Sequence, residues 1–317
     1  MKTRIITVLQ GMVMGIAEII PGVSGSTLAL VMGIYDNFIE FLSEISDFFK
    51  SCIKFILRKE SFSEVKKDFL SIRWNFGIFL IVGMGVSIVL FSHIISGLIE
   101  EHPQYIFAFF FGLVIASITI PWNEMKIKGF REFATIAITF VIFFVVLGLK
   151  PAIVENPSPL FLFFAGAVAI CAMVLPGISG SFVMLLLGVY DYVIGLIKDF
   201  TKLSIDLNKV VALLSVVAGI VLGFSVFVKF LKLGLKKYPS EIMAFLIGIM
   251  LASLRVLWPF MDVSTLGTEQ TEPLPKVLPW EIPGTQLLLS IVFILIAIGI
   301  VIILHKFSKG NNTDGIR

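Results

Sequence analysis

The stretch AEIIPGVSGSTLALVMGIYD at residues 17–36 returns as AMVLPGISGSFVMLLLGVYD at residues 172–191, with 10 of the 20 aligned positions identical. Most of the shared residues are not apolar. Each copy holds a Pro-Gly pair, a Ser-Gly-Ser triplet, a later glycine and a Tyr-Asp pair. Helix-breaking, hydroxyl-rich elements that occur twice in apolar sequence are typical of broken helices around a site in the middle of a membrane. The repeat therefore predicts a transporter.

The composition places the chain in a membrane. Hydrophobic residues make up 57% of the sequence, the mean hydropathy is +1.01, and 15% of residues are charged, against about 25% in soluble domains. Residues 133–149 and 287–304 carry no charge, and such runs approach the length that crosses a bilayer core of about 30 Å. We expect an all-α integral membrane protein that forms a single transmembrane domain.

A second internal match defines the organisation. IFAFFFGLVIAS at residues 106–117 aligns with IMAFLIGIMLAS at residues 242–253, with 6 of 12 positions identical. The first repeat is then 1–150, with a broken or re-entrant hairpin at 5–49, and the second is 159–305, with a hairpin at 159–200. Three helices follow each hairpin, which gives about six spanning helices: 76–99, 104–121, 132–150, 208–231, 240–258 and 285–305.

The two repeats have opposite orientations. An odd number of spans per repeat turns the second one upside down, whether the hairpins re-enter or span fully. If the N-terminus is cytoplasmic, 19 of the 25 Lys and Arg residues lie on the cytoplasmic side. This strong positive-inside bias predicts an inverted-topology repeat with both termini in the cytoplasm.

The Pro-Gly and Ser-Gly-Ser elements predict an anion site. Each Pro-Gly should end one half-helix, and the serines should begin the next, since Ser and Thr are good N-caps. Freed backbone groups are tolerated in a membrane only where they are buried in protein or line a wet cavity. The start of a helix presents unpaired N–H groups and a positive dipole end, which attract anions. Two facing tips could hold a phosphate or carboxylate through Ser24, Gly25, Ser26, Thr27, Ser179, Gly180 and Ser181, shaped by Pro21, Gly22, Pro176 and Gly177.

A packing role is the alternative for these elements, because Pro-Gly can kink a helix and small residues permit close helix contacts. Asp36 and Asp191 lie 12 residues after Ser24 and Ser179, about 18 Å along a helix. They are therefore too distant to share the tip site. We expect them to be N-caps of a further helical piece at the hairpin mouth.

Two charged residues lie within apolar sequence. Glu18 precedes the first Pro-Gly, and its counterpart in the second copy is Met173. An intramembrane carboxylate indicates a proton or cation relay; alternatively it snorkels to the interface or accepts hydrogen bonds from freed backbone N–H groups. Arg255 could pair with a phosphate through its planar guanidinium, or it could snorkel to the headgroups.

The paired PG-x-SGS elements with their following G-[IV]-Y-D, together with GMVMGIAEIIPGVSGST at residues 11–27, resemble the polyprenyl-phosphate transporters. This PopT-type family was long known only as a bacterial membrane domain of unknown function. The resemblance covers nearly the whole chain. It implies a flippase in the bacterial inner (plasma) membrane that returns undecaprenyl phosphate from the outer to the inner leaflet, recycling the lipid carrier for cell-wall polymers. We expect no catalytic residues, no cofactor and no metal.

Two other functions compete with this one. A channel or exchanger for a small inorganic anion could also use Gly/Ser-rich helix N-termini. A lipid-phosphate phosphatase would need a nucleophilic or acid–base histidine near the phosphate. The sequence has three histidines, His93, His102 and His305, and none lies near a Ser-Gly-Ser element, which makes the phosphatase the weakest hypothesis.

Overall fold

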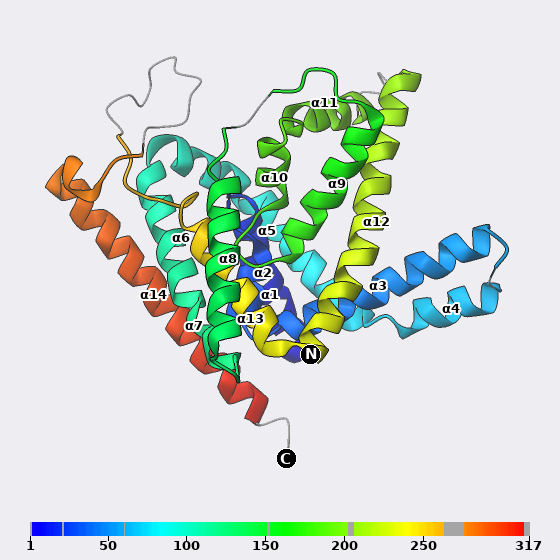
Figure 1. Cartoon of the computed structure of the whole chain (residues 1–317), viewed down its shortest axis with the longest axis horizontal. Helices are drawn as coiled ribbons and strands as arrows, with labels where there is room; N and C mark the ends of the chain where they lie inside the picture. Colours follow the sequence, from blue (N-terminus) through cyan, green and yellow to red (C-terminus); the bar gives the residue numbers. More distant parts are fainter. Residues whose placement is uncertain are drawn as a thin grey trace.

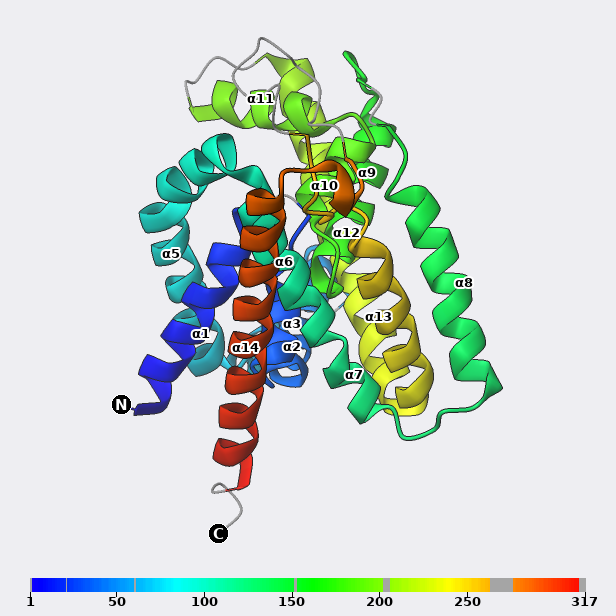
Figure 2. The same cartoon turned by 90° about the vertical axis from the view of Figure 1, so that its left-hand side faces the viewer.

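The computed structural model describes residues 2–20, 22–59, 61–150, 153–201, 206–262 and 276–313, and it is built from α-helices (Figures 1 and 2). This confirms the predicted all-α membrane fold. The first half of the chain contains α1 (Lys2–Glu18), α2 (Gly25–Val31), α3 (Tyr35–Ile56), α4 (Phe62–Ser71), α5 (Trp74–Glu101), α6 (Pro103–Ser117), α7 (Thr119–Glu124) and α8 (Phe130–Val146). The second half contains α9 (Pro159–Val174), α10 (Gly180–Leu186), α11 (Tyr190–Thr201), α12 (Leu207–Lys237), α13 (Pro239–Ser253), the 3-10 helix η1 (Pro279–Glu281) and α14 (Gly284–Thr313).

Within the described residues, four segments are long and apolar enough to cross a membrane: Trp74–Glu101, Pro103–Glu124, Leu207–Lys237 and Gly284–Lys306. The other two predicted spans, 132–150 and 240–258, form shorter helices that end at Val146 and Ser253. Gly148 follows the first of these ends by two residues, and glycine disfavours continuation of a helix. The second hairpin also bends after its short helix, because α10 and the described part of α11 meet at 113°.

Each hairpin begins with a helix packed closely on a spanning helix. The first helix, α1, packs along α5, and α9 packs in the same way along α12. Glycines permit this approach: a Cβ at Gly83 of α5 would overlap the Val8 carbonyl oxygen, and a Cβ at Gly219 of α12 would overlap the Phe163 carbonyl oxygen. Small residues at such contacts are a common means of packing helices in membranes.

The remaining helices pair across the two predicted repeats. The first-repeat helix α6 packs on α14, and the second-repeat helix α13 packs on α8. Here too glycines lie at the contact: a Cβ at Gly112 would lie 2.5 Å from the Ile294 carbonyl oxygen, and a Cβ at Gly248 would lie 2.8 Å from that of Ile136. Helices of one predicted repeat thus pack on helices of the other, so the two repeats form a single bundle. The repeat boundaries themselves stay a prediction.

The most buried part of the molecule lies where α6, α13 and α2 come together. Ala108, Leu246, Ile249 and Met250 are among its buried side chains. The N-terminal end of α1 and the C-terminal end of α14 lie at the same end of the bundle, whereas α11 lies at the opposite end (Figures 1 and 2). The two hairpins therefore approach this buried centre from opposite ends.

Candidate functional site

The first tip is the turn between α1 and α2. Gly22 has a φ of +85°, which favours glycine. Ser24 is the N-cap of α2, and its hydroxyl accepts a hydrogen bond from the Ser26 backbone N–H at 3.3 Å, as the sequence predicts. The hydroxyls of Ser24 and Ser26 also lie 2.6 Å apart. Pro21, predicted to shape this turn, lies outside the described residues.

The second tip, between α9 and α10, repeats this construction. Gly177 has a φ of +95°, and Pro176 beside it is buried. Ser179 is the N-cap of α10, although its hydroxyl makes no capping bond to the backbone. It lies instead 2.7 Å from the Ser181 hydroxyl. Each tip therefore presents a pair of serine hydroxyls at the start of a short helix.

A glycine ends each short helix. Gly33 and Gly188 have φ values of +67° and +72°. Backbone N–H groups donate from Ile34 to the Ala29 carbonyl at 2.9 Å and from Gly33 to the Leu30 carbonyl at 3.0 Å, the pattern of a Schellman motif. Equivalent bonds around Gly188 end α10 in the same way.

The prediction for the two aspartates was wrong in detail. Asp36 and Asp191 are not N-caps but lie inside the first turns of α3 and α11, one residue after the first helical residue. The preceding Schellman turn lets each new helix begin at the tyrosine, Tyr35 or Tyr190. A carboxylate in the first turn still interacts favourably with the helix dipole, so their structural role remains.

The two tips contact one another directly. Thr27 Oγ1 accepts a hydrogen bond from the backbone N–H of Gly177 at 2.9 Å. The Ser24 hydroxyl donates to the Met173 carbonyl at 3.2 Å, and the Tyr35 hydroxyl donates to the Val174 carbonyl at 3.2 Å. The structure thus brings together the two Pro-Gly and Ser-Gly-Ser elements that lie far apart in the sequence.

Two residues at this contact were absent from the predicted site. Tyr35 belongs to the Tyr-Asp pair that both copies share, which was an available signal. Ser253 lies on α13 beside the second tip: a Cβ at Gly177 would lie 3.3 Å from the Ser253 hydroxyl oxygen. Its signal was also present, because the second internal match ends with a serine in both copies, at Ser117 and Ser253.

Glu18 lies at the first tip. Its Oε1 accepts a hydrogen bond from the backbone N–H of Gly25 at 2.8 Å. A bond of this kind was one of the two alternatives to a relay role for Glu18. The carboxylate therefore occupies one of the unpaired donors at the start of α2. Its counterpart in the second tip, Met173, is exposed, so that tip contains no equivalent internal anion.

The glycines of the Ser-Gly-Ser elements face their own hairpins. A Cβ at Gly25 would lie 2.9 Å from Glu18 Oε1 and 3.1 Å from the Met14 carbonyl oxygen, and one at Gly180 would lie 2.7 Å from the Ala169 carbonyl oxygen. Both glycines thus permit close packing of the short helix on the preceding one. At these two positions, the geometry matches the packing interpretation.

Arg255 lies in the turn after α13, and its side chain points to α8. Its guanidinium donates to the Phe144 carbonyl at 2.9 Å and lies over the Phe144 ring, with 4.5 Å from Cζ to the ring centroid. A Cβ at Gly148 would overlap it. Its neighbour Val256 reaches the first tip, because a Cβ at Gly22 would lie 2.7 Å from Val256 Cγ1. A direct contact between Arg255 and a phosphate at the tips stays a prediction.

The polar groups at the tips are suited to binding an anion. The part of the chain that the structure describes contains no cluster of three or more His, Cys, Asp or Glu side chains that could hold a metal ion. The tips offer hydroxyls and backbone N–H groups, which can solvate an anion.

Comparisons with known proteins place the chain in a family. Residues 14–273 match the family model described as undecaprenyl phosphate translocase-like. A polyprenyl-phosphate transporter of Vibrio cholerae is 34% identical over 314 residues, which cover 96% of each chain. A polyprenyl-phosphate transporter of Staphylococcus aureus is 31% identical over 270 residues, which cover 80% of this chain and 86% of the relative. No solved structure matches significantly.

Proposed function

The chain belongs to the undecaprenyl phosphate translocase-like family, and on this premise we propose that it transports a polyprenyl phosphate lipid across the membrane and is not an enzyme. We further propose that it returns undecaprenyl phosphate from the outer to the inner leaflet, so that the lipid carrier can be reused for envelope polymers. The observation that supports this function best is the meeting of the two tips, linked by the Thr27–Gly177 hydrogen bond.

The proposed phosphate site lies at these tips. Ser24, Ser26, Thr27 and Ser179 are buried, whereas Ser181 is exposed. We propose that the phosphate first meets the Ser181 side of the second tip, where no internal carboxylate competes for donors. Hydroxyls and N–H groups would replace part of its hydration shell. Arg255 could join them only by leaving the Phe144 carbonyl.

We propose that Glu18 couples transport to a proton or another cation. Moving an anionic headgroup inward works against an inside-negative potential by about 2.3 kcal/mol per charge per 100 mV. A cation carried with the substrate offsets this cost. Glu18 is suited to this role because its carboxylate lies at the first tip, bonded to Gly25 N, and because Met173 gives the second tip no counterpart.

The orientation is also a proposal. The start of α1 and the end of α14 lie at the same end of the bundle, and most Lys and Arg residues are expected on that side. Both features support cytoplasmic termini in a bacterial inner membrane. A cysteine introduced at Ser61 should then be protected from an impermeant reagent added to cells, and one at Asn156 should react. The opposite pattern would reverse the proposed orientation.

Transport itself is tested in proteoliposomes loaded with labelled undecaprenyl phosphate. A membrane-impermeant phosphatase added outside reports the lipid in the outer leaflet. We expect the protein to make the protected lipid accessible at a rate far above that of protein-free vesicles. In a parallel assay without the lipid, a chloride flux would instead support the inorganic-anion channel or exchanger. If the lipid remains protected and chloride does not move, the proposed function is wrong.

A further inference from the structure

The outer part of α3, together with α4, forms a surface hairpin, defined here as residues 49–70, that projects sideways from the bundle (Figure 1). No residue of α4 is buried. Large apolar side chains of the surface hairpin are exposed: Phe49, Ile53, Phe55, Ile56, Leu57, Phe62, Phe69 and Leu70. This apolar surface lies outside the predicted transport path and has no role in the function proposed above.

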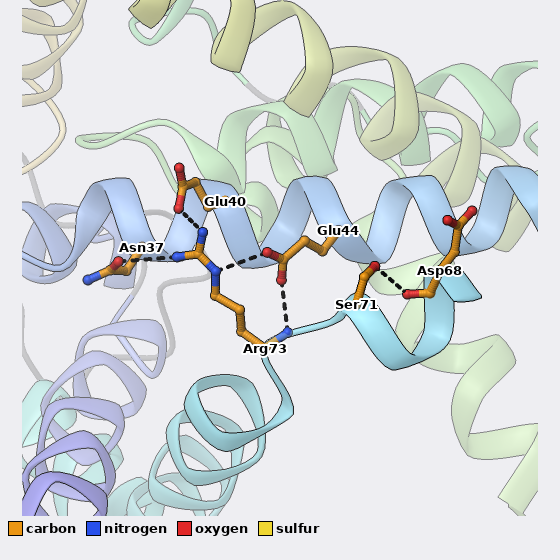
Figure 3. A network of polar contacts seen from close by, with 6 residues as sticks. All are labelled: Asn37, Glu40, Glu44, Asp68, Ser71 and Arg73. Atoms are coloured by element: carbon orange, nitrogen blue, oxygen red, sulfur yellow. Dashed lines mark hydrogen bonds and ion pairs between the residues drawn. The ribbon is translucent and has the colours of Figure 1, made fainter. Parts of the chain in front are cut away.

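A network of polar contacts fixes the inner end of the surface hairpin (Figure 3). Arg73, the residue before α5, forms ion pairs with Glu40 and Glu44 of α3, with 2.9 Å from its Nε to Glu44 Oε1. Its backbone N–H also donates to Glu44 Oε2 at 2.9 Å. Asp47 pairs with Lys229 of α12. These acids are thus matched by bases at the bundle, and the hairpin is held at a set position on it.

Beyond this network the surface hairpin carries an excess of positive charge. Residues 49–70 contain six basic residues, Lys50, Lys54, Arg58, Lys59, Lys66 and Lys67, against three acidic ones, Glu60, Glu64 and Asp68. Five of the six are lysines. Lysine is depleted in the cores of protein–protein interfaces, but lysine clusters beside amphipathic helices are typical of contacts with anionic membrane surfaces.

The helix α4 is amphipathic. At 100° per residue, Phe62, Phe69 and Leu70 lie on one side, with the long side chain of Lys66 among them, and Glu64, Lys67 and Asp68 lie on the other. Phe62 and Phe69 hold α4 against α3 through ring contacts with Phe55 at 6.0 Å and Phe48 at 5.5 Å between centroids. Even so, Phe62 and Leu70 are 65% and 66% exposed, so this packing leaves an apolar edge uncovered.

The level of the surface hairpin is set by Trp74. This residue begins the spanning helix α5, and its indole N–H donates to the Phe69 carbonyl of α4 at 2.9 Å. Tryptophan at the end of a spanning helix marks the membrane–water interface. The end of α4 therefore lies at the same depth as the boundary between headgroups and acyl chains.

We propose that the surface hairpin lies in the membrane interface and binds anionic phospholipids. Its exposed apolar side chains enter the outer part of the acyl chains, and its lysines and Arg58 contact the phosphate groups. Amphipathic segments with basic residues nearby associate with anionic lipid in this way. The apolar edge, the basic excess and the depth set by Trp74 all fit this partner.

The experiment uses the full chain in vesicles, with Cys52 and Cys171 replaced by alanine and a fluorescent dye on a single new cysteine. One vesicle contains phosphatidylcholine alone, and the other contains equal parts of phosphatidylcholine and phosphatidylglycerol. We expect a dye at Leu70→Cys to be quenched by lipids with a nitroxide high in the acyl chain. A matched dye at Glu64→Cys, on the polar side of the same helix, should be quenched by iodide. Lipid quenching at Leu70→Cys should be stronger with phosphatidylglycerol.

The charge requirement is tested by changing Arg58, Lys59, Lys66 and Lys67 to glutamine. Each basic residue near an anionic surface strengthens association about fivefold, so this variant should lose most of the response to phosphatidylglycerol. A control variant loses the same charge by changing Lys126, Lys128, Lys236 and Lys237 to glutamine. It should keep the response to phosphatidylglycerol.

Three results would overturn the proposal. Equal iodide quenching at Leu70→Cys and Glu64→Cys would show a solvated hairpin. Protection of the Leu70→Cys dye from both quenchers would place protein on this face. A response to phosphatidylglycerol that survives in the hairpin charge variant would remove the anionic lipid as its partner.

Discussion

All seven residues of α2 are buried, whereas in α10 Gly180 alone is buried and Ser181 is exposed. The two helices come from the same repeated pattern and have the same length. Their surroundings differ: α2 contacts α1, α3, α6, α9 and α14, while the main contacts of α10 are with α9 and α11. The same local sequence therefore forms a closed first tip and a more open second tip.

We propose that this difference reflects one end state of a carrier. A protein built from inverted repeats can expose its site alternately by exchanging the conformations of the two repeats. The hydrogen bonds at the tips are correspondingly one-sided, because Ser24, Thr27 and Tyr35 of the first tip contact the backbone of the second. We expect the opposite state to bury α10 and to open α2.

The largest effect should come from a side chain added where α10 meets α9. In Gly180→Ala the new Cβ would lie 2.7 Å from the Ala169 carbonyl oxygen, a backbone atom, so α10 must shift. Overpacking of this kind costs about 1–3 kcal/mol. Gly25→Ala meets first the flexible end of Glu18 and should cost less. Thermal unfolding in detergent compares the two, and an equal loss would remove this difference between the tips.

A somewhat smaller effect is expected at the hydrogen bond between the tips. Thr27→Val keeps the side-chain shape but leaves the buried Gly177 N–H without its acceptor, which costs about 1–3 kcal/mol. The counterpart of Thr27 is Phe182, which offers no hydroxyl, so this bond has no equivalent in the opposite state. Thr27→Val should therefore lower thermal stability and favour the opposite state, measured as faster labelling of a cysteine at Ser26. Unchanged stability with unchanged labelling would exclude a locking role.

Much of this comparison could be predicted from local pattern. The repeated Pro-Gly and Ser-Gly-Ser elements predicted the glycine turns at Gly22 and Gly177 and the N-caps at Ser24 and Ser179, because turns and caps depend on neighbouring residues. The apolar runs likewise predicted the long spans. The predicted N-cap at Asp36 was wrong, because the N-cap of α3 is Ile34, two residues earlier. The Schellman turn at Gly33 sets this start and was not recognised from the sequence.

Longer-range features could not be predicted. The pattern of apolar residues does not predict that α6 pairs with α14 or that α8 pairs with α13. In a membrane helix, the face toward lipid is as apolar as the face toward other helices, so the sequence does not distinguish them. For the same reason, the contact of Arg255 with Phe144 and the unequal burial of the two tips depend on tertiary packing. Two copies of one motif look symmetric in sequence even when the folded state is not.

A third prediction concerns the carboxylate that the second tip lacks. Glu18→Gln keeps an oxygen acceptor for Gly25 N but removes the charge, and a single charge at a helix start contributes about 0.3–1 kcal/mol. Stability should therefore fall only slightly. If Glu18 carries the coupling proton, the variant should still bind polyprenyl phosphate but lose the pH dependence of transport. Transport by Glu18→Gln with the pH profile of the unmodified protein would make Glu18 structural.

The smallest effect on stability, and the sharpest test of the open tip, is expected at Ser181. Ser181→Ala removes an exposed hydroxyl that lies 2.7 Å from the hydroxyl of the buried Ser179, so the free energy of unfolding should fall by about 0.5 kcal/mol, the lower end for a lost hydrogen bond. The buried counterpart Ser26→Ala removes a hydroxyl that lies 2.6 Å from Ser24 Oγ and should cost more. Transport should respond differently, since Ser181 is the hydroxyl that an incoming phosphate can reach in this state. We therefore expect Ser181→Ala to raise the substrate concentration needed for half-maximal transport while its melting temperature falls only slightly. If Ser181→Ala transports with unchanged kinetics, the second Ser-Gly-Ser element acts as a packing device, and the phosphate enters elsewhere.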